Sequence, residues 1–335
     1  MTIEENVLLA PLTTFRIGGP ARFFVRVRTI EELKEALAFA RAKNSRVLVL
    51  GGGSNILVDN SGFEGLVIKI EITGIARKGG TYIAGAGESW DVLVGRAVDD
   101  GMWGVENLSG IPGSVGGAVV QNIGAYGQAL SQTFEWAEVY DRQDGSIKTL
   151  GREVCGFGYR GSIFQNEPDR YVVLHAAFKL FSGATPNIEY KDLAARFGTS
   201  SPALRELRRA VIDIRAGKFP DLVQEGTAGS FFKNPTLPVG EARQLQKRYP
   251  ELPLFPLPES DRVKIPLGWF LDYRHGVLDM RGVTVGNARM YEKQFLVLVA
   301  AHHSSSDDIK KLAELVKEKI RAVLRMEVEP EVHFV

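Results

Sequence analysis

The residues best placed to do chemistry stand in three short runs of the sequence. Ser230 lies in TAGSFFKNP, where it follows Gly229 and precedes two phenylalanines. In such an apolar setting a hydroxyl is either a hydrogen-bonded core group or a proton carrier. No histidine adjoins it and no G-x-S-x-G elbow surrounds it, so we do not expect an ordinary activated serine nucleophile. Arg160 ends the run FGYR beside aromatic residues and is either a functional cation or a plain surface arginine.

The third run, MEVEPEVHFV, alternates as a strand does. One face carries Met326, Val328, Val332 and Phe334, and the other carries Glu327, Glu329, Glu331 and His333. Pro330 marks this predicted strand as an edge or a bulge, because proline has no N–H to donate to a neighbour. Taken alone, the polar face is a solvated acidic surface.

The run VLGGGSN contains Gly51, Gly52, Gly53, Ser54 and Asn55 and follows a short apolar strand. A dinucleotide-binding fingerprint would need a third spaced glycine at position 56 and a helix starting at the loop, but isoleucine and strand-like residues stand there. The loop can still bring backbone amides and a hydroxyl against phosphate oxygens. The alternative interpretation is that the loop is a tight turn without a ligand.

The run IPGSVGGAVVQNIGAYG at residues 111–127 leaves little side chain between backbone and ligand, since Ser114 and Ala118 accompany its glycines. Such a segment suits a pyrophosphate. The amides of Gln121 and Asn122 could read a ring edge, and Tyr126 could stack on it. The alternative is a glycine-rich structural loop between sheets.

Composition narrows the function classes. The chain has 41 basic and 40 acidic residues, so no net field would gather nucleic acid or a membrane surface. The single cysteine, Cys155, excludes an intramolecular disulfide and a thiolate cluster and fits a small buried apolar residue. No histidine has a metal-ligand spacing, so we expect no metal. Without a basic signal segment or an apolar run of about 20 residues, we expect a cytoplasmic protein.

The elements that must position these residues follow from apolar spacing. Helices are predicted at 30–43, from Trp90 to Gly101, from Pro202 to Gly217, and from the capping pair Ser305 and Asp308 onward. Strands are predicted at RVLVL, LVIKI, YVVLHAAFKL and FLVLVA. The pattern predicts an α+β protein with a domain boundary near residue 217.

Taken together, seven motifs resemble the UDP-N-acetylenolpyruvoylglucosamine reductase family, in order and nearly end to end. They are TTFRIGGPA, VLGGGSN, GAGESW, IPGSVGGAVVQNIGAYG, FGYR, AGSFFKNP and EPEV. The resemblance implies a two-part FAD-binding region of the vanillyl-alcohol-oxidase superfamily and a C-terminal α+β substrate-binding domain. The predicted bounds are 1–215 for the FAD-binding region, with subdomains of about 1–72 and 73–215, then 216–322 for the substrate domain and 323–335 for a final strand carrying Glu331.

The activity that the resemblance implies belongs to peptidoglycan precursor synthesis. NADPH would reduce a non-covalently bound FAD, and the reduced flavin would convert UDP-N-acetylglucosamine enolpyruvate to UDP-N-acetylmuramate. Arg160 would stabilise the charge that develops on the substrate carboxylate. Glu331 would support it as a protonated acid. Ser230 would protonate the adjacent carbon, oriented by Lys233 or a water chain.

Further site residues also come from the resemblance. NIEYKDL at 187–193 is similar to the substrate-capping loop of the family's longer form, which makes Tyr190 a substrate residue together with Lys218, Asn234 and Gln294. Arg215 is expected near FAD or the diphosphate. The expected cofactor-binding residues are Gly51, Gly52, Gly53, Ser54, Asn55, Gly113, Ser114, Gly117, Asn122, Gly124, Ala125, Tyr126 and Arg215.

Two other functions remain open from the sequence. The chain could be another FAD-dependent oxidoreductase of the same superfamily, for which AGSFFKNP and EPEV would have no role. It could also be a non-catalytic protein that binds a nucleotide sugar through the glycine runs. We expect a monomer.

Overall fold

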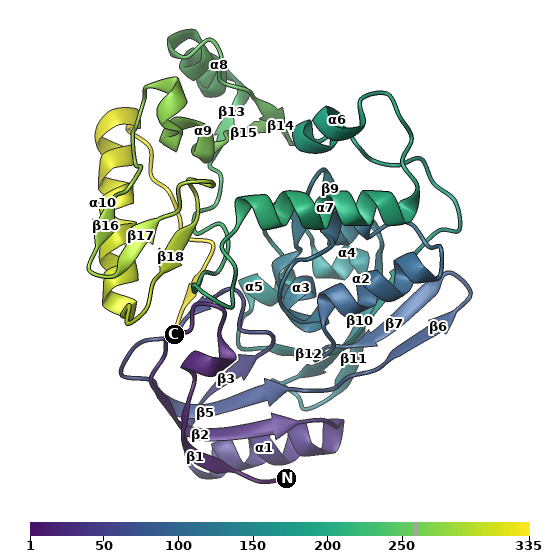
Figure 1. Cartoon of the computed structure of the whole chain (residues 1–335). Coiled ribbons are helices and arrows are strands. Elements are labelled where there is room, and N and C mark those ends of the chain that lie inside the picture. Colours follow the sequence, from purple (N-terminus) through teal and green to yellow (C-terminus); the bar gives the residue numbers. More distant parts are fainter. Residues whose placement is uncertain (258–259) are drawn as a thin grey trace. The chain divides into compact units, whose positions relative to one another are not determined.

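The computed structural model describes residues 1–257 and 260–335, which form two compact units (Figure 1). The first unit comprises Met1–Val7, Ala21–Gly53 and Phe63–Gly217. The second comprises Leu8–Pro20, Ser54–Gly62 and Lys218–Val335. Each unit has its own hydrophobic core, so each is described by itself.

The first unit begins with a four-stranded sheet in the order β1-β2-β5-β3. Its strands are β1 (Glu4–Leu8), β2 (Pro20–Val27), β3 (Arg46–Leu50) and β5 (Phe63–Ile70). Strands β2 and β3 both run parallel to β5. Helix α1 (Ile30–Ala42) packs on β3 and β5, and Thr29 caps it by accepting the Glu32 backbone N–H at 3.2 Å. The first glycine run starts at Gly51, directly after the carboxyl end of β3.

A second, antiparallel sheet of the same unit has the order β11-β10-β12-β7-β6. Its strands are β6 (Ile75–Lys78), β7 (Thr81–Gly85), β10 (Phe134–Asp141), β11 (Ile147–Gly151) and β12 (Tyr171–Lys179). Helix α2 (Trp90–Asp99) buries Trp90, whose ring meets Phe178 of β12 edge to face at 5.5 Å. Helix α3 (Val115–Gln121) packs on β12 and β7.

The remaining elements complete the first unit. They are η2 (Glu106–Leu108), β8 (Gly124–Ala125), β9 (Gln128–Ala129), η3 (Leu130–Gln132), α4 (Arg152–Cys155), α5 (Ile163–Asn166), α6 (Lys191–Phe197) and α7 (Leu204–Lys218). In α7 the residues Leu204, Leu207, Ala210 and Val211 are buried and Ile214 is half-buried, so one face of the helix packs on the unit. The helix continues one residue beyond its predicted end at Gly217.

In the second unit, helix α10 (Ser306–Leu324) packs on a sheet of β16 (Thr284–Val285), β17 (Ala288–Met290) and β18 (Leu298–Ala300) (Figure 1). The predicted capping pair is confirmed: the Ser305 hydroxyl accepts the Asp308 N–H at 3.1 Å, and the Asp308 carboxylate accepts the Ser305 N–H at 3.0 Å. The remaining elements are η1 (Ala10–Leu12), β4 (Ile56–Leu57), β13 (Thr236–Pro238), α8 (Val239–Arg248), β14 (Phe255–Pro256), β15 (Arg262–Lys264), α9 (Leu267–Leu271), η4 (Tyr273–His275) and β19 (His333–Phe334).

The predicted strand at 323–335 is wrong over most of its length. Helix α10 runs on through Leu324 and ends at Arg325, whose φ of 53° is left-handed. Only His333 and Phe334 form a strand, β19, parallel to β4. Phe334 is 47% exposed, whereas Val332 of the same predicted face is buried. Before β19, Pro330 forms only an isolated antiparallel bridge with Phe232.

The compact units also differ from the predicted contiguous domains. Residues 8–20 and 54–62, placed by the sequence within the FAD-binding region, belong to the second unit. The reason is packing, since Phe15, Ile17 and Leu57 are part of the second unit's core. Residues 323–335 join the same unit instead of standing apart.

Candidate active site

The two glycine runs meet within the first unit. A Cβ added to Gly52 would lie 2.4 Å from the Gly113 Cα, and one added to Gly51 would lie 2.6 Å from the Ser114 Oγ. Both distances are far shorter than van der Waals contact. At Gly52 the neighbour is backbone, so only glycine fits there, whereas at Gly51 a side chain would displace the Ser114 hydroxyl. The close approach of the two loops therefore explains why both runs are built of residues with almost no side chain.

The first run keeps amides available for a ligand. Among the hydrogen bonds of residues 1–257 and 260–335, none uses the backbone N–H of Gly52 or Gly53 as a donor. Gly53 has a left-handed φ of 66°. Where right- and left-handed residues alternate, successive backbone N–H groups point into one concavity that can bind an anion. Lys69 of β5 donates to the Gly51 carbonyl, and burial lowers the pKa of its ammonium. The sequence missed Lys69, because a lysine in an apolar strand carries no motif.

The second run is a helix start rather than a free loop. Ser114 caps α3, its hydroxyl accepting the Gly117 N–H at 3.3 Å. The Val115 and Gly116 amides donate to the carbonyls of Glu88 and Ala86, both at 2.9 Å. These amides are therefore used within the protein, and the glycines of this run serve close packing. Gly113, Ser114 and Gly117 stay predictions as cofactor-binding residues.

Arg160 occupies a strained position in a tight turn. Gly158 and Gly161 exchange backbone hydrogen bonds of 3.0 and 3.3 Å, which leaves only Tyr159 and Arg160 between them. The φ of Arg160 is 51°, a left-handed value that residues other than glycine, asparagine and aspartate rarely adopt. Its guanidinium donates to the Gly124 carbonyl at 3.1 Å, so it lies against the second glycine run.

Left-handed backbone recurs at other predicted site residues of this unit. Asn122 has a φ of 42° and Tyr126 a φ of 48°. Such conformations cost about 1–3 kcal/mol each and persist only where the surroundings enforce them, which is commonest at functional sites. The coincidence of three of them with predicted site residues within one unit favours a functional site around the second glycine run.

Tyr126, Tyr190 and Arg215 form one cluster. The two tyrosine rings meet edge to face at 5.1 Å, and the Arg215 guanidinium lies in hydrogen-bonding reach of the Tyr126 hydroxyl. Burial raises the pKa of Tyr126 to about 12 and lowers the pKa of Arg215. Arg215 also donates from Nε to the Gly110 carbonyl at 3.0 Å. The first unit thus brings a predicted substrate residue, Tyr190, against two predicted cofactor residues.

Asn107, which the sequence did not single out, holds the segment that leads to Tyr190. Its Nδ2 donates to the carbonyls of Tyr126 and Asn187, both at 2.8 Å, and Asn187 donates in turn to the Gly127 carbonyl at 3.1 Å. Asn107 is fully buried, and its Oδ1 accepts no hydrogen bond within residues 1–257 and 260–335. A single asparagine in a short helical turn gives no sequence signal.

In the second unit, Ser230 lies on a segment paired by backbone on both sides. Ser230 bridges to Val297, and Phe231 donates its N–H to the Leu296 carbonyl at 2.7 Å. On the other side the Glu331 N–H donates to the Phe231 carbonyl at 2.7 Å. The structure therefore brings the Ser230 and Glu331 segments together as neighbours joined by backbone hydrogen bonds and an isolated bridge. Lys233 forms an ion pair with Glu329 at 3.2 Å.

Ser54 and Asn55 of the first glycine run belong to the second unit. Asn55 donates from Nδ2 to the Glu331 carbonyl at 2.9 Å, and its own carbonyl accepts the His333 N–H at 3.0 Å. Both bonds hold the chain on either side of Val332. Asn55 thus fixes the segment that carries Glu331.

The predicted substrate residues Asn234 and Gln294 both lie near the start of α9. The Asn234 Oδ1 accepts the Leu267 N–H at 2.9 Å, and the Gln294 Oε1 would lie 3.7 Å from a Cβ added to Gly268. Lys218 is the last residue of α7 and is assigned to the second unit. Arg160 belongs to the first unit and Ser230 and Glu331 to the second, so the three candidate catalytic residues form two separate groups.

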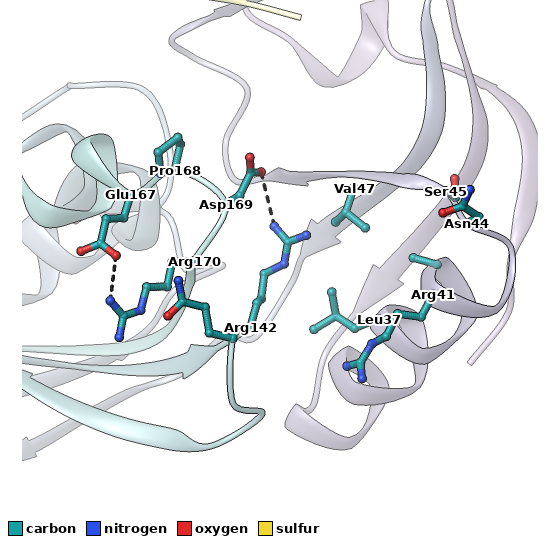
Figure 2. A pocket seen from close by; sticks show the side chains of 12 residues that line it. Leu37, Arg41, Asn44, Ser45, Val47, Arg142, Glu167, Pro168, Asp169 and Arg170 are labelled. Atoms are coloured by element: carbon teal, nitrogen blue, oxygen red, sulfur yellow. Dashed lines mark hydrogen bonds and ion pairs between the residues drawn. The ribbon is translucent and has the colours of Figure 1, made fainter.

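An open cavity of about 650 Å³ in the first unit contains none of the predicted site residues (Figure 2). It lies at the amino end of β3, whereas the glycine run follows the carboxyl end. Its charged side chains are mostly paired within the wall, as Arg142 is with Asp169 at 3.5 Å. We therefore do not place the active site there.

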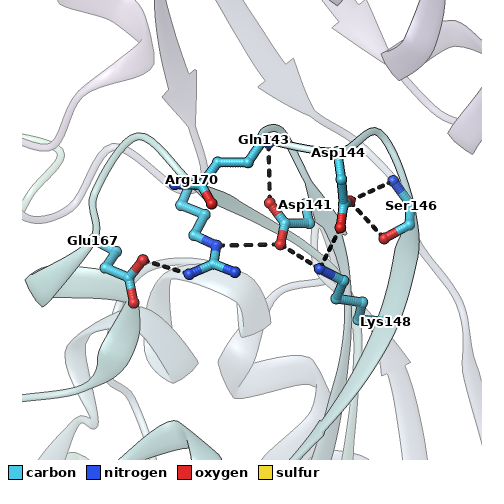
Figure 3. A network of polar contacts seen from close by, with 7 residues as sticks. All are labelled: Asp141, Gln143, Asp144, Ser146, Lys148, Glu167 and Arg170. Carbon is cyan, nitrogen blue, oxygen red and sulfur yellow. Dashed lines mark hydrogen bonds and ion pairs between the residues drawn. The ribbon is translucent and has the colours of Figure 1, made fainter.

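A network of hydrogen bonds and ion pairs surrounds the buried carboxylate of Asp141 (Figure 3). The fully buried Asp141 accepts hydrogen bonds from Lys148 at 2.7 Å and Arg170 at 3.1 Å, and Arg170 also donates to Glu167 at 2.7 Å. Burial acts to raise the pKa of Asp141, but the hydrogen bonds from Lys148, Gln143 and Arg170 outweigh it and hold that pKa below its ordinary value. Arg170 directly precedes β12.

Other features bear on the predictions. Cys155 is buried, and burial raises the pKa of its thiol to about 12, which confirms it as a small apolar residue. Within the described part of the chain no cluster of three or more histidine, cysteine or acidic side chains could hold a metal ion. None of the helices described is both long and apolar enough to cross a membrane.

Comparisons with known proteins agree with these features. The family described as FAD binding domain matches residues 21–151, and the family described as UDP-N-acetylenolpyruvoylglucosamine reductase, C-terminal domain, matches residues 221–335. The UDP-N-acetylenolpyruvoylglucosamine reductase of Pseudomonas aeruginosa is 37% identical over 339 residues, covering 99% of this chain and 98% of the relative. That of Ralstonia nicotianae is 39% identical over 341 residues, covering 98% of each chain.

A solved structure extends the similarity to the fold. The crystal structure of UDP-N-acetylenolpyruvylglucosamine reductase from Thermus caldophilus matches with a TM-score of 0.71 and 28% identity, covering 100% of this chain and 99% of the other. The α+β fold with an FAD-binding region and a C-terminal domain, and the family resemblance found from the motifs, are thereby confirmed. This chain belongs to the UDP-N-acetylenolpyruvoylglucosamine reductase family.

Proposed function

We propose that this protein reduces UDP-N-acetylglucosamine enolpyruvate to UDP-N-acetylmuramate with NADPH and FAD, in peptidoglycan precursor synthesis. Family membership over the whole chain supports the reaction, and the FAD binding domain match at residues 21–151 supports the cofactor. The structural observation that carries the site assignment is the left-handed turn that holds Arg160 against Gly124 of the second glycine run.

The residues of the first unit fit a bound dinucleotide cofactor. The amides of Gly52 and Gly53 are available to phosphate oxygens, and the contact between Gly52 and Gly113 leaves no side chain in the way. FAD, when bound, accepts a hydride from NADPH and supplies it to the methylene carbon of the enolpyruvyl group. The protein's task is then to bind, orient and protonate the substrate.

Arg160 is proposed to bind the substrate carboxylate. Hydride addition to the methylene carbon moves electrons onto the carboxylate, and a fixed guanidinium lowers the energy of that charge distribution. A planar guanidinium can also hold a carboxylate through two parallel hydrogen bonds, which fixes its orientation. The turn that restricts the Arg160 backbone would reduce the reorganisation needed when the substrate binds.

Ser230 and Glu331 are proposed to complete the reaction from the second unit. Ser230 would donate a proton from Oγ to the carbon next to the carboxylate, and Glu331 would hydrogen-bond the carboxylate as an acid. The backbone pairing between their segments supports a joint role. Lys233 is engaged with Glu329, so an ordered water is our preferred route for returning the Ser230 proton.

Anaerobic half-reaction kinetics test this function. Purified protein should carry a yellow flavin spectrum, and NADPH should bleach it. Adding UDP-N-acetylglucosamine enolpyruvate should restore the colour within seconds. Colourless protein that cannot be loaded with FAD would contradict the flavin chemistry, and reduced protein that the substrate fails to reoxidise would contradict the assigned substrate.

A monomer in the cytoplasm is the proposed working form. NADPH and nucleotide sugars are metabolites of the cytoplasm, and a free thiol such as Cys155 is compatible with its reducing conditions. Light scattering at several concentrations tests the monomer, and cell fractionation tests the location.

A further inference from the structure

Asn122 is the C-cap residue of helix α3, and both the nitrogen and the oxygen of its side-chain amide form hydrogen bonds within the protein. Its Nδ2 donates to the Gly158 carbonyl at 2.9 Å, and its Oδ1 accepts the Ser131 N–H at 3.1 Å. The residue is 6% exposed and has left-handed φ and ψ of 42° and 59°. Asparagine suits this position because it tolerates left-handed backbone and offers a donor and an acceptor together.

The Gly158 carbonyl that Asn122 binds is the first corner of the turn carrying Arg160. The same carbonyl accepts the Gly161 N–H, so Asn122 and Gly161 share it. Only one residue separates Gly158 from Arg160. Any shift of Gly158 therefore moves the Arg160 backbone, which the turn holds at a φ of 51°.

Two further side chains tie the same segment to the end of α3. Ser162 donates from Oγ to the Val120 carbonyl at 2.7 Å, and Gln165 donates from Nε2 to the same carbonyl at 3.1 Å. At its other end α3 is capped by Ser114, whose hydroxyl would lie only 2.6 Å from a Cβ added to Gly51. One short helix thus connects the first glycine run with the Arg160 turn.

We propose that Asn122 is a positioning residue for Arg160 and not a direct ligand of the flavin. Its amide holds the Gly158–Gly161 turn against the end of α3, which sets the distance from the guanidinium to the cofactor-binding loops. The inference rests on the proposed function, because it matters only if Arg160 binds the substrate carboxylate. Misplacing such a group by about 1 Å can cost about a hundredfold in rate.

Asn122→Asp is the sharpest variant. It keeps the shape, the tolerance for left-handed backbone and the acceptor facing Ser131, but it replaces the donor facing the Gly158 carbonyl by a carboxylate oxygen. We expect flavin reduction by NADPH within about twofold of the parent, and reoxidation by UDP-N-acetylglucosamine enolpyruvate slowed about ten- to hundredfold. The FAD dissociation constant and the visible spectrum should not change.

Two further variants serve as a control and as a replacement for Asn122→Asp. Asn44→Asp changes the same residue type at a φ of 48°, but at an exposed position after α1 with no bond to the turn, and both half-reactions should be unaffected. If Asn122→Asp does not fold, Asn122→Gly removes both side-chain bonds without backbone cost and should give the same selective loss.

A double-mutant cycle with Arg160→Ala separates the possible failures. If Asn122 acts through Arg160, Asn122→Asp should slow reoxidation by less than about twofold once Arg160 is removed. Independent, multiplying effects would overturn the positioning role. Weaker FAD binding with equal loss in both half-reactions would also overturn it, in favour of a direct flavin contact. If Arg160→Ala alone leaves reoxidation unchanged, the proposed role of Arg160 fails and this inference fails with it.

Discussion

The segments that carry Arg160 and Ser230 are held in place by different kinds of hydrogen bond. Arg160 lies in a left-handed turn that side chains from α3 and its own segment tie down, including Asn122 and Ser162. Ser230 lies in an extended segment whose neighbours on both sides are bound through backbone groups. A side-chain tie can be removed by one substitution, whereas a backbone pairing survives most substitutions.

This difference indicates which substitutions should displace each candidate residue. Substitution of residues around Arg160 should alter its position without unfolding the unit, so its surroundings should tune activity. Substitution of residues around Ser230 should leave the serine in place until the pairing itself breaks. Four predictions test this contrast, beginning with the largest expected effect.

Ser230→Ala should leave the backbone pairing intact and remove only the hydroxyl. We expect flavin reduction by NADPH to be nearly unchanged and reoxidation by the substrate to slow by about 10²–10⁴-fold, the usual range for a lost proton donor. Stopped-flow absorbance under anaerobic conditions measures both steps. Equal loss in both steps would mean a folding or FAD-binding defect and would contradict the assigned role.

Gly52→Ala tests the close contact between Gly52 and Gly113, which is made by backbone atoms and so cannot be relieved by moving a side chain. The new Cβ would lie 2.4 Å from the Gly113 Cα, so the loops must separate at a cost of about 1–3 kcal/mol, which would weaken FAD binding about 5- to 150-fold. Flavin fluorescence titration of the apoprotein measures this. Gly183→Ala is the matched control, because its Cβ meets nothing within 4 Å. Equal affinities in the two variants would refute the packing argument.

Asp141→Asn removes a buried charge that Lys148 and Arg170 bind, and it should destabilise the folded state by about 1–3 kcal/mol at pH 7. The pKa of Asp141 is held below its ordinary value, so its stabilisation is complete above about pH 4 and is lost as the pH falls through the lower folded pKa. The gap in Tm between variant and parent should therefore close on acidification. Asp144→Asn, at an exposed carboxylate, should change Tm little.

A matched pair of hydroxyl deletions tests the contrast most finely. Ser162 donates to the Val120 carbonyl at 2.7 Å. Thr227 donates to the Leu298 carbonyl at 2.8 Å and also accepts the Gly229 N–H at 3.2 Å, beside the backbone-paired Ser230. Ser162→Ala and Thr227→Val should each cost about 1 kcal/mol of stability. Reoxidation by the substrate should slow about three- to tenfold only in Ser162→Ala, because Thr227 lies in the backbone-paired region. Similar rates in both variants would remove the distinction.

Much of the fold follows from local sequence signals. The pair Ser305 and Asp308 predicts the start of α10, apolar spacing predicts a helix at 30–43 where α1 lies, and the run RVLVL predicts β3; all three are confirmed. The alternation of residues 326–335 predicted a strand because it has a strand's period. Pro330 has no N–H to donate, and the chain forms only an isolated bridge there with the Ser230 segment. The helix α3 was hidden by its glycines, which lower helix propensity but allow close packing.

The sequence by itself determined the family, the candidate residues Arg160, Ser230 and Glu331, and the glycine runs suited to a phosphate compound, since motif order and residue type are local properties. Only the tertiary structure decided that the Gly52 and Gly53 amides are available while the Gly117 amide is used by Ser114. It alone also placed Arg160 in a left-handed turn bound to Asn122. The physical reason is that hydrogen-bond partners and backbone strain depend on groups far apart in the chain, which no local pattern records.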